Sequence, residues 1–184
     1  MTSYSGRLGI LLMTYGSPSS LEDVPRYLTA VRGGRAPDAE LVTEFTRRYE
    51  VIGGSPLVGR TEAQARALES RMSGEAVVRA GMRFSEPSIE TALRDLIESG
   101  VDRVVAIILS PQYSPLIMGG YHRAVEAARA AVGTDAPVVE VAGAWHREPA
   151  FVDALAQRIV EALDHASPDQ RDSIPVLLTA HSLP

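Results

Sequence analysis

The feature that most constrains the fold is a set of five short apolar runs spaced along the whole chain. They are rich in Val, Ile and Leu and are nearly continuous rather than alternating, which is typical of strands covered on both faces. Helical patterns lie between them; in the last one, Phe151, Leu155 and Ile159 repeat every four residues. Strands that alternate with helices predict an α/β fold with a parallel sheet and right-handed crossovers. The predicted strands are residues 8–13, 76–80, 103–109, 138–142 and 176–179.

The chain shows no boundary that would divide it into separate domains. It has 184 residues, of which 45% are hydrophobic, which is enough apolar material for one domain of ordinary size. No internal repeat, long linker or low-complexity segment interrupts it. We therefore expect residues 1–184 to form one α/β unit.

Charge and cysteine content argue against several functional classes. The net charge of −5 is the opposite of what a nucleic-acid-binding surface needs. The absence of cysteine excludes disulfides and thiolate metal sites within this chain. The first apolar run, residues 8–13, is too short for a signal peptide or a membrane span. We expect a cytoplasmic protein that binds no nucleic acid and has no transmembrane segment.

Parallel sheets of this kind bind ligands at the carboxyl ends of their strands, so the residues after each run matter most. Aromatic side chains gather there: Tyr15, Tyr113, Tyr121 and Trp145. They are either a layer packed between loops and sheet, or the walls of a flat slot for a planar ligand. Spacing alone leaves both interpretations open.

Among the four histidines, His181 is the best placed for function because it follows the last apolar run. The other three, His122, His146 and His165, lie in or beside helices, and we interpret them as structural or surface residues. None of the four forms an HxH or HxxxH pair. A metal site made by this chain alone is therefore not predicted.

Three arginines in predicted helices and one glycine-rich turn are further candidates for ligand binding. Arg32, Arg47 and Arg48 form either a solvated face or a set of partners for ligand carboxylates. Residues 53–56, Gly-Gly-Ser-Pro, are typical of a helix stop followed by a turn. No Walker loop and no GxGxxG follows the first strand, so a standard nucleotide site is poorly supported.

Four strings, taken together and in this order, resemble the ferrochelatase family. They are LLMTYGSP after the first strand, RYEVIGGSPL, LSPQYS, and the terminal TAHSLP, and the resemblance runs from about Leu8 to Pro184. The first loop, with Tyr15, resembles the bacterial, coproporphyrin-type branch. The resemblance implies the first of two Rossmann-like, chelatase-like lobes that enclose a porphyrin cleft. It also implies insertion of ferrous iron into a porphyrin during heme synthesis.

The resemblance assigns roles to five residues. It implies that His181 contacts the metal or accepts pyrrole protons, and that Tyr15 faces the macrocycle and metal from the other side. It places Arg32 near the propionates of the substrate, and Ser55 and Tyr121 along the porphyrin pocket. Iron is implied as a substrate, and no permanently bound cofactor is expected.

Two departures from the family pattern qualify this interpretation. Gly33 follows Arg32, where relatives of this branch often have a second arginine. Family members are about twice as long, and their second lobe carries an acidic residue that faces the histidine. We therefore expect this chain to be the first lobe of a longer protein, with the C-terminal lobe as its partner, and to be inactive alone.

Two other functions remain compatible with the sequence. One is a module that binds a tetrapyrrole without catalysis. The other is a chelatase for another tetrapyrrole and metal, such as a sirohydrochlorin cobaltochelatase.

Overall fold

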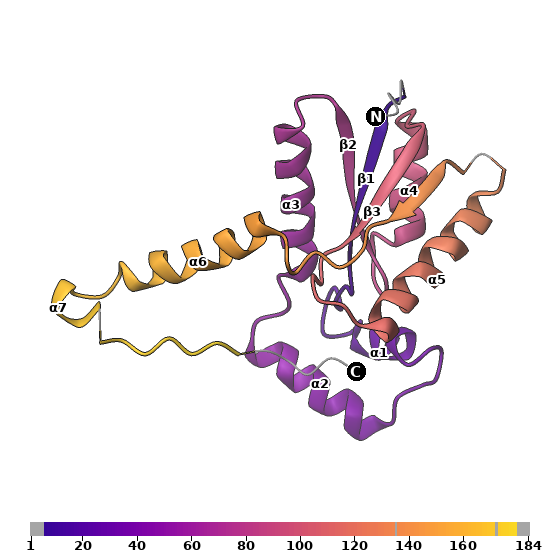
Figure 1. Ribbon diagram of the computed structural model, residues 1–184. Helices are drawn as coiled ribbons and strands as arrows, with labels where there is room; N and C mark the ends of the chain where they lie inside the picture. The colour runs from indigo at the N-terminus through magenta and orange to yellow at the C-terminus, as the bar shows by residue number, and fades with distance from the viewer. Residues whose placement is uncertain (1–5, 135, 172, 180–184) are drawn as a thin grey trace.

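The central layer of the molecule is a four-stranded parallel sheet in the order β2-β1-β3-β4 (Figure 1). The computed structural model describes residues 6–134, 136–171 and 173–179. β1 (Leu8–Thr14) pairs with β2 (Ala76–Met82) on one side and β3 (Arg103–Ile108) on the other. β4 (Val138–Val141) pairs with β3 at one edge. Four of the five predicted strands and the parallel sheet are thus confirmed.

Helices cover both faces of β1, which explains its continuous apolar sequence. Leu11 and Met13 belong to a core shared with α4 (Ile89–Glu98) and α5 (Pro115–Val132). Ile10 and Leu12 belong to a second core on the other face, which includes Ala65 of α3 (Leu57–Arg71). Because alternate strand residues point to opposite faces, the strand is apolar on both faces from Leu8 to Met13, and its last residue, Thr14, is polar.

Helix caps place the two helices on the first of these faces. The hydroxyl of Ser88 accepts a hydrogen bond from the amide of Thr91, which starts α4. The hydroxyl of Ser114 accepts from the amide of Ile117, and Pro115 occupies the first turn of α5. These side chains satisfy amide groups that have no partner inside the helix.

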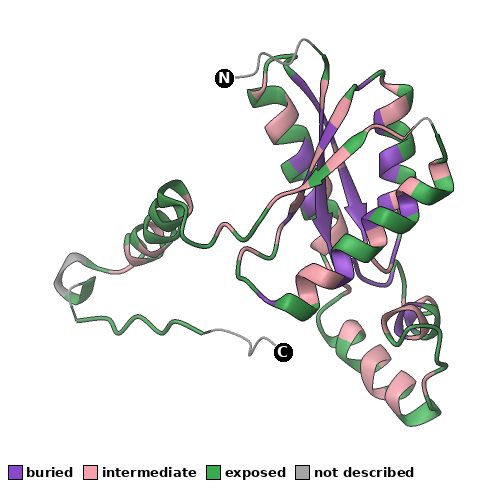
Figure 2. Cartoon of the chain, turned by 45° about the vertical axis from the view of Figure 1, so that its right-hand side comes forward, coloured by how far each residue is buried: buried purple, intermediate pink, exposed green. Residues whose placement is uncertain are grey.

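Two short helices lie beyond the carboxyl ends of the strands. α1 (Val24–Val31) and α2 (Ala39–Val51) pack against each other there (Figure 1). α1 has buried residues, among them Tyr27, whereas α2 has none (Figure 2). This pair therefore borders the edge of the sheet at which a ligand site is expected.

The fifth predicted strand is wrong. Residues 174–179 are extended but pair with none of the four strands, and Leu177 and Leu178 are 85% and 78% exposed. α6 (Pro149–Leu163) and α7 (Pro168–Arg171) lead the chain away from the sheet before this segment begins (Figure 1). An apolar run shows that a segment needs burial, but it does not identify the partner that buries it.

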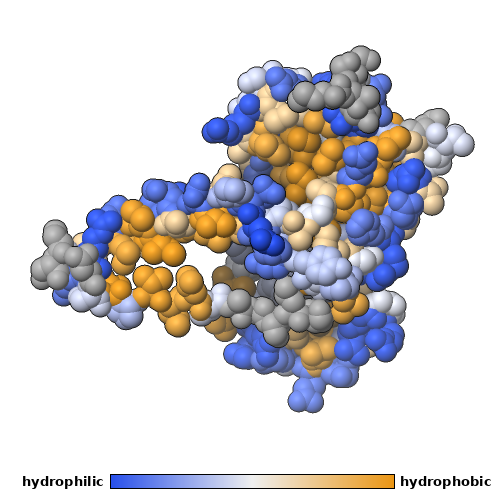
Figure 3. Space-filling view, in the orientation of Figure 1, coloured by the Kyte–Doolittle hydropathy of each residue, from blue (hydrophilic) through white to orange (hydrophobic). Residues whose placement is uncertain are grey.

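Apolar surface is exposed on this projecting part and on the sheet. α6 has no buried residue, and apolar side chains gather along it and along residues 174–178 (Figure 3). A further groove of about 590 Å³ opens beside α3, and Ile107, Leu109 and Trp145 are among the residues that line it. α3 packs mainly on β2 and β1, and the groove lies between α3 and the end of β3.

Leu96→Ala and Leu155→Ala form a matched pair that tests which helices hold the fold together. Leu96 of α4 is 0% exposed and Leu155 of α6 is 51% exposed. We expect Leu96→Ala to lower the free energy of unfolding by about 2–5 kcal/mol because it leaves a cavity. Leu155→Ala should change it by less than about 0.5 kcal/mol. Urea unfolding of the two variants measures both values, and equal losses would show that α6 packs on the body in solution.

Candidate functional site

The loops that follow β1 and β2 are joined by backbone hydrogen bonds that continue the parallel ladder. The amide of Arg83 donates to the carbonyl of Thr14 over 2.9 Å, and the amide of Phe84 donates to that of Tyr15 over 3.1 Å. Tyr15 is therefore held at the carboxyl end of the central strand. This edge of the sheet is where ligands bind in folds of this type.

Gly16 makes the sharp turn directly after Tyr15. Its φ of +87° is in the left-handed region, and a Cβ at this position would overlap the hydroxyl of Ser85. The same hydroxyl accepts a hydrogen bond from the amide of Ser17 over 3.2 Å. On the other side, the phenol of Tyr27 donates to the carbonyl of Gly16 over 3.1 Å. The loop is thus fixed by side chains from β2–α4 and from α1.

Tyr27 of α1 is buried beside this loop, and Tyr49 of α2 lies next to it and is half-buried. Burial raises the pKa of Tyr27 far above its usual value, and it also raises the pKa of Tyr49. Because burial raises its pKa, the phenol of Tyr27 is protonated near neutral pH and can donate to the carbonyl of Gly16.

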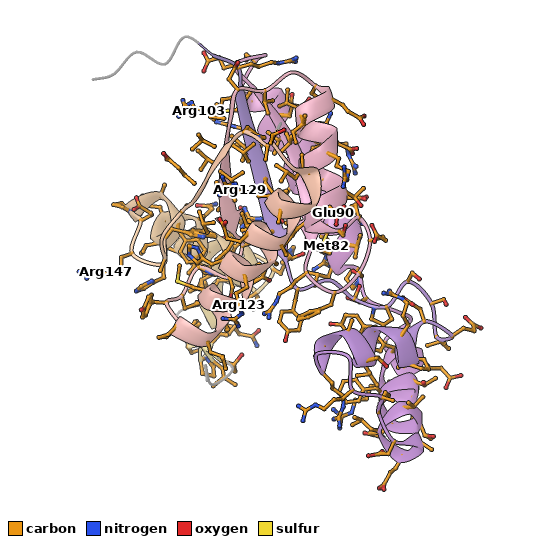
Figure 4. The ribbon with its side chains drawn as sticks, turned by 90° about the vertical axis from the view of Figure 1, so that its right-hand side faces the viewer. Met82, Glu90, Arg103, Arg123, Arg129 and Arg147 are labelled. Atoms are coloured by element: carbon orange, nitrogen blue, oxygen red, sulfur yellow. The ribbon has the colours of Figure 1, made fainter. Side chains whose placement is uncertain are left out.

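Tyr15 itself is accessible, with 40% of its surface exposed. Its ring meets the ring of Phe84 edge to face, with 4.6 Å between the centroids. The guanidinium carbon of Arg83 lies 4.6 Å from the Phe84 centroid and 5.8 Å from that of Tyr15. Figure 4 labels Met82, which precedes Arg83, near the end of β2. The result is an exposed aromatic surface with a cation packed against it.

Tyr121, in contrast, is a buried residue of α5. It is 2% exposed, and its ring lies 5.7 Å from the guanidinium carbon of Arg83. Burial raises the pKa of the Tyr121 phenol strongly, and the positive charge of Arg83 opposes this only in part. In this arrangement the ring of Tyr121 packs against the Arg83 guanidinium from the buried side.

Ser55 and Arg32 lie in the region formed by α1 and α2. Ser55 lines a cleft of about 600 Å³ that also includes Tyr49 and Gly53. Its hydroxyl accepts a hydrogen bond from the amide of Leu57, the first residue of α3, over 3.3 Å. Arg32 is exposed at the carboxyl end of α1, and no described carboxylate forms an ion pair with it.

The other aromatic candidates do not join this group. Tyr113 is 63% exposed. Trp145 donates from its indole nitrogen to the carbonyl of Ile108 over 2.8 Å and packs edge to face on Phe151. Of the four strand-end aromatics, the structure brings only Tyr15 and Tyr121 together, around Arg83.

His181 lies outside the described residues. Within residues 6–134, 136–171 and 173–179, no group of three or more His, Asp or Glu side chains is arranged to hold a metal ion. In the same part of the chain, no helix combines the length and the apolar sequence that crossing a membrane requires.

Comparison with known proteins identifies the family. The family model described as Ferrochelatase matches residues 7–184. This chain belongs to the ferrochelatase family. It is 34% identical to the coproporphyrin III ferrochelatase of Geobacillus sp. (strain WCH70), over 97% of this chain and 59% of that protein. The coproporphyrin III ferrochelatase of Bacillus subtilis (strain 168) is 36% identical over the same shares, 97% and 59%.

The chain spans somewhat more than half the length of these relatives. The ferrochelatase of Deinococcus radiodurans gives the same picture, with 37% identity over 96% of this chain and 57% of that protein. Among solved structures, a putative cobalamin biosynthesis CbiX protein from Marinobacter aquaeolei VT8 aligns with a TM-score of 0.48 and 16% identity. That alignment covers 86% of this chain and 99% of the other.

The structure adds residues that sequence reasoning did not single out. Arg83, Ser85 and Tyr27 surround the Tyr15 loop, although they lie 68, 68 and 11 positions from Tyr15, Ser17 and Gly16, respectively. The sequence offered one indication that Arg83 belongs to the site, namely its position shortly after a predicted strand. Nothing in the spacing of Ser85 or Tyr27 pointed to the loop.

Gly16→Ala and Gly53→Ala test whether the ferrochelatase loop after β1 depends on a close approach. Both glycines have positive φ, +87° and +70°, but only the Cβ of Gly16 would meet a neighbouring atom. Each alanine should cost about 1–2 kcal/mol of stability for its backbone conformation. Gly16→Ala should cost more because it also displaces Ser85. Chemical unfolding measures both, and equal losses would contradict the close packing of Gly16 on Ser85.

Proposed function

We propose that this chain forms one wall of the porphyrin site of a ferrochelatase, which inserts ferrous iron into coproporphyrin III. The observation that carries the proposal is the accessible Tyr15 at the end of the central strand, packed beside Arg83 in a ferrochelatase-family chain. The choice of coproporphyrin III is supported by relatives that are named coproporphyrin III ferrochelatase.

The chemistry of the described residues suits a flat, anionic macrocycle. An exposed aromatic ring provides a surface for a planar apolar ligand. Arg32, which forms no ion pair with the described carboxylates, is suited to bind a propionate because guanidinium and carboxylate match in bidentate geometry. Ser55 borders the same loops and presents a hydroxyl to the cleft. In this proposal Tyr121 acts indirectly, because it contacts Arg83, and Arg83 in turn contacts the Tyr15 ring.

Metal insertion requires two pyrrole N–H protons to leave as the ferrous ion enters. His181 is proposed as their acceptor and as a metal contact, since a neutral imidazole accepts a proton near neutral pH and binds ferrous iron. Tyr15 would face the macrocycle and metal from the opposite side. A rigid slot that favours a bent macrocycle exposes the nitrogen lone pairs and lowers the barrier.

The second wall of the cleft is proposed to come from a C-terminal lobe. The matching relatives are longer, and this chain covers 59% of two of them. That lobe would supply the acidic residue opposite His181. Residues 1–184 alone would then bind porphyrin but would not complete the proton transfer.

The first test compares binding with insertion. We expect residues 1–184 to change the absorbance spectrum of coproporphyrin III on titration, yet to insert neither iron nor zinc. Turnover at the rate of a two-lobe ferrochelatase would contradict the need for a second wall. Binding without insertion, even after a C-terminal lobe is added, would instead identify a tetrapyrrole-binding module. Cobalt insertion into sirohydrochlorin in place of iron insertion would identify the other chelatase.

The second test addresses His181 in a protein that contains both lobes. We expect His181→Ala to reduce kcat by about 10²–10⁴-fold, because it removes the proton acceptor. The affinity for porphyrin should change little. His165→Ala is the control, since His165 is exposed at the end of α6 and should leave kcat unchanged. Normal turnover in the His181 variant would assign the proton transfer to another group.

A further inference from the structure

The guanidinium of Arg83 is held by aromatic rings rather than by a carboxylate. Its central carbon lies 4.6, 5.7 and 5.8 Å from the ring centroids of Phe84, Tyr121 and Tyr15. No described Asp or Glu forms an ion pair with it. A cation in this position is attracted to the negative faces of the rings. The location of the guanidinium and that of the Tyr15 ring therefore depend on each other.

A glycine on α5 makes room for this arrangement. A Cβ at Gly120 would overlap the guanidinium of Arg83, whereas a Cβ at Gly119 would only meet the Arg123 guanidinium at 3.4 Å. Gly120 is buried in the interior of α5, where glycine lowers helix stability. The absence of a side chain at Gly120 lets the Arg83 guanidinium approach the backbone of α5, which offsets the loss of helix stability.

We propose that Arg83 is a positioning residue that acts through Tyr15. Seated on Gly120 and backed by Tyr121, it holds the Tyr15 ring in the orientation that faces the porphyrin. The role in porphyrin binding rests on the proposed function, whereas the placement of the ring does not. Figure 4 labels Met82, the last residue of β2 and the neighbour of Arg83, and Arg123 in the middle of α5.

The test uses two substitutions that remove the contact in different ways. Arg83→Met deletes the charge but keeps much of the chain length. Gly120→Ala retains the arginine at position 83 but displaces its guanidinium. Alanine is a better helix former than glycine, so we expect this variant to fold. Gly119→Ala is the matched control on the neighbouring position. Circular dichroism and urea unfolding establish that all three variants are folded.

The first readout is the Tyr15 ring itself, followed by NMR in residues 1–184 with ¹³C-labelled tyrosine and assigned with Tyr15→Phe. We expect Arg83→Met and Gly120→Ala to shift the aromatic signals of Tyr15, and Gly119→Ala to leave them unchanged. Unshifted signals in both variants would overturn the proposal, whether or not porphyrin binds.

The second readout is the affinity for coproporphyrin III, measured with and without Tyr15→Ala. With Tyr15 present, Arg83→Met and Gly120→Ala should each weaken binding by about 3- to 10-fold, the effect of losing cation–π contacts. In the Tyr15→Ala background, neither substitution should weaken it further, because Arg83 acts through that ring. Additive losses would show that Arg83 acts independently of Tyr15. Absence of binding by the unsubstituted chain would contradict the proposed function, and the NMR comparison would still decide the inference.

Discussion

The structure depends on the burial of one strand, β1, from both faces while it is hydrogen-bonded on both edges. Leu11 and Met13 are fully buried on one face, and Ile10 and Leu12 are buried on the other. β2 and β3 pair with it in register from Leu8 onwards. Burial on both faces and hydrogen bonding on both edges leave β1 little freedom. The direction of the strand and the position at which it ends are therefore well defined. Whatever follows Thr14 is consequently held in a defined place.

The candidate site results from this placement and from the loops that join it. Tyr15 leaves the sheet at the carboxyl end, and Gly16 turns the chain within contact of Ser85. Tyr27 then binds the same turn from α1. Because the loop after β2 and helix α1 both contact two consecutive residues, Tyr15 and Gly16, the loop has little freedom. A rigid aromatic wall of this kind suits the flat ligand of the proposed function.

The projecting C-terminal part behaves differently from the body. α6 has a regular apolar repeat but no buried residue, and residues 174–179 are exposed despite their apolar sequence. The same pattern that correctly predicted β1, β2, β3 and β4 was therefore misleading for the fifth run. Periodicity measures the need for burial. Pairing depends on whether a free strand edge is within reach, and the path of α6 carries the chain away from β4.

α3 illustrates the opposite case, because the sequence did not indicate it as a helix. Its two buried residues, Thr61 and Ala65, are small, and the larger apolar residues that pack beside them, Val58, Leu68 and Met72, are only partly buried. It nevertheless covers the β2 and β1 side of the sheet. Small side chains allow a helix to lie close to a sheet, so weak periodicity and good packing occur together here.

By itself, the sequence determined the fold class, four of the strands and the family, because local apolar patterns and short strings of residues are read directly from the order of the chain. Only the tertiary structure decided which distant residues surround Tyr15. Arg83, Gly120 and Tyr121 come together because β2 ends beside β1 and α5 crosses the same edge of the sheet. The spacing of these residues along the chain does not predict their contact, because the contact results from the packing of strands and helices.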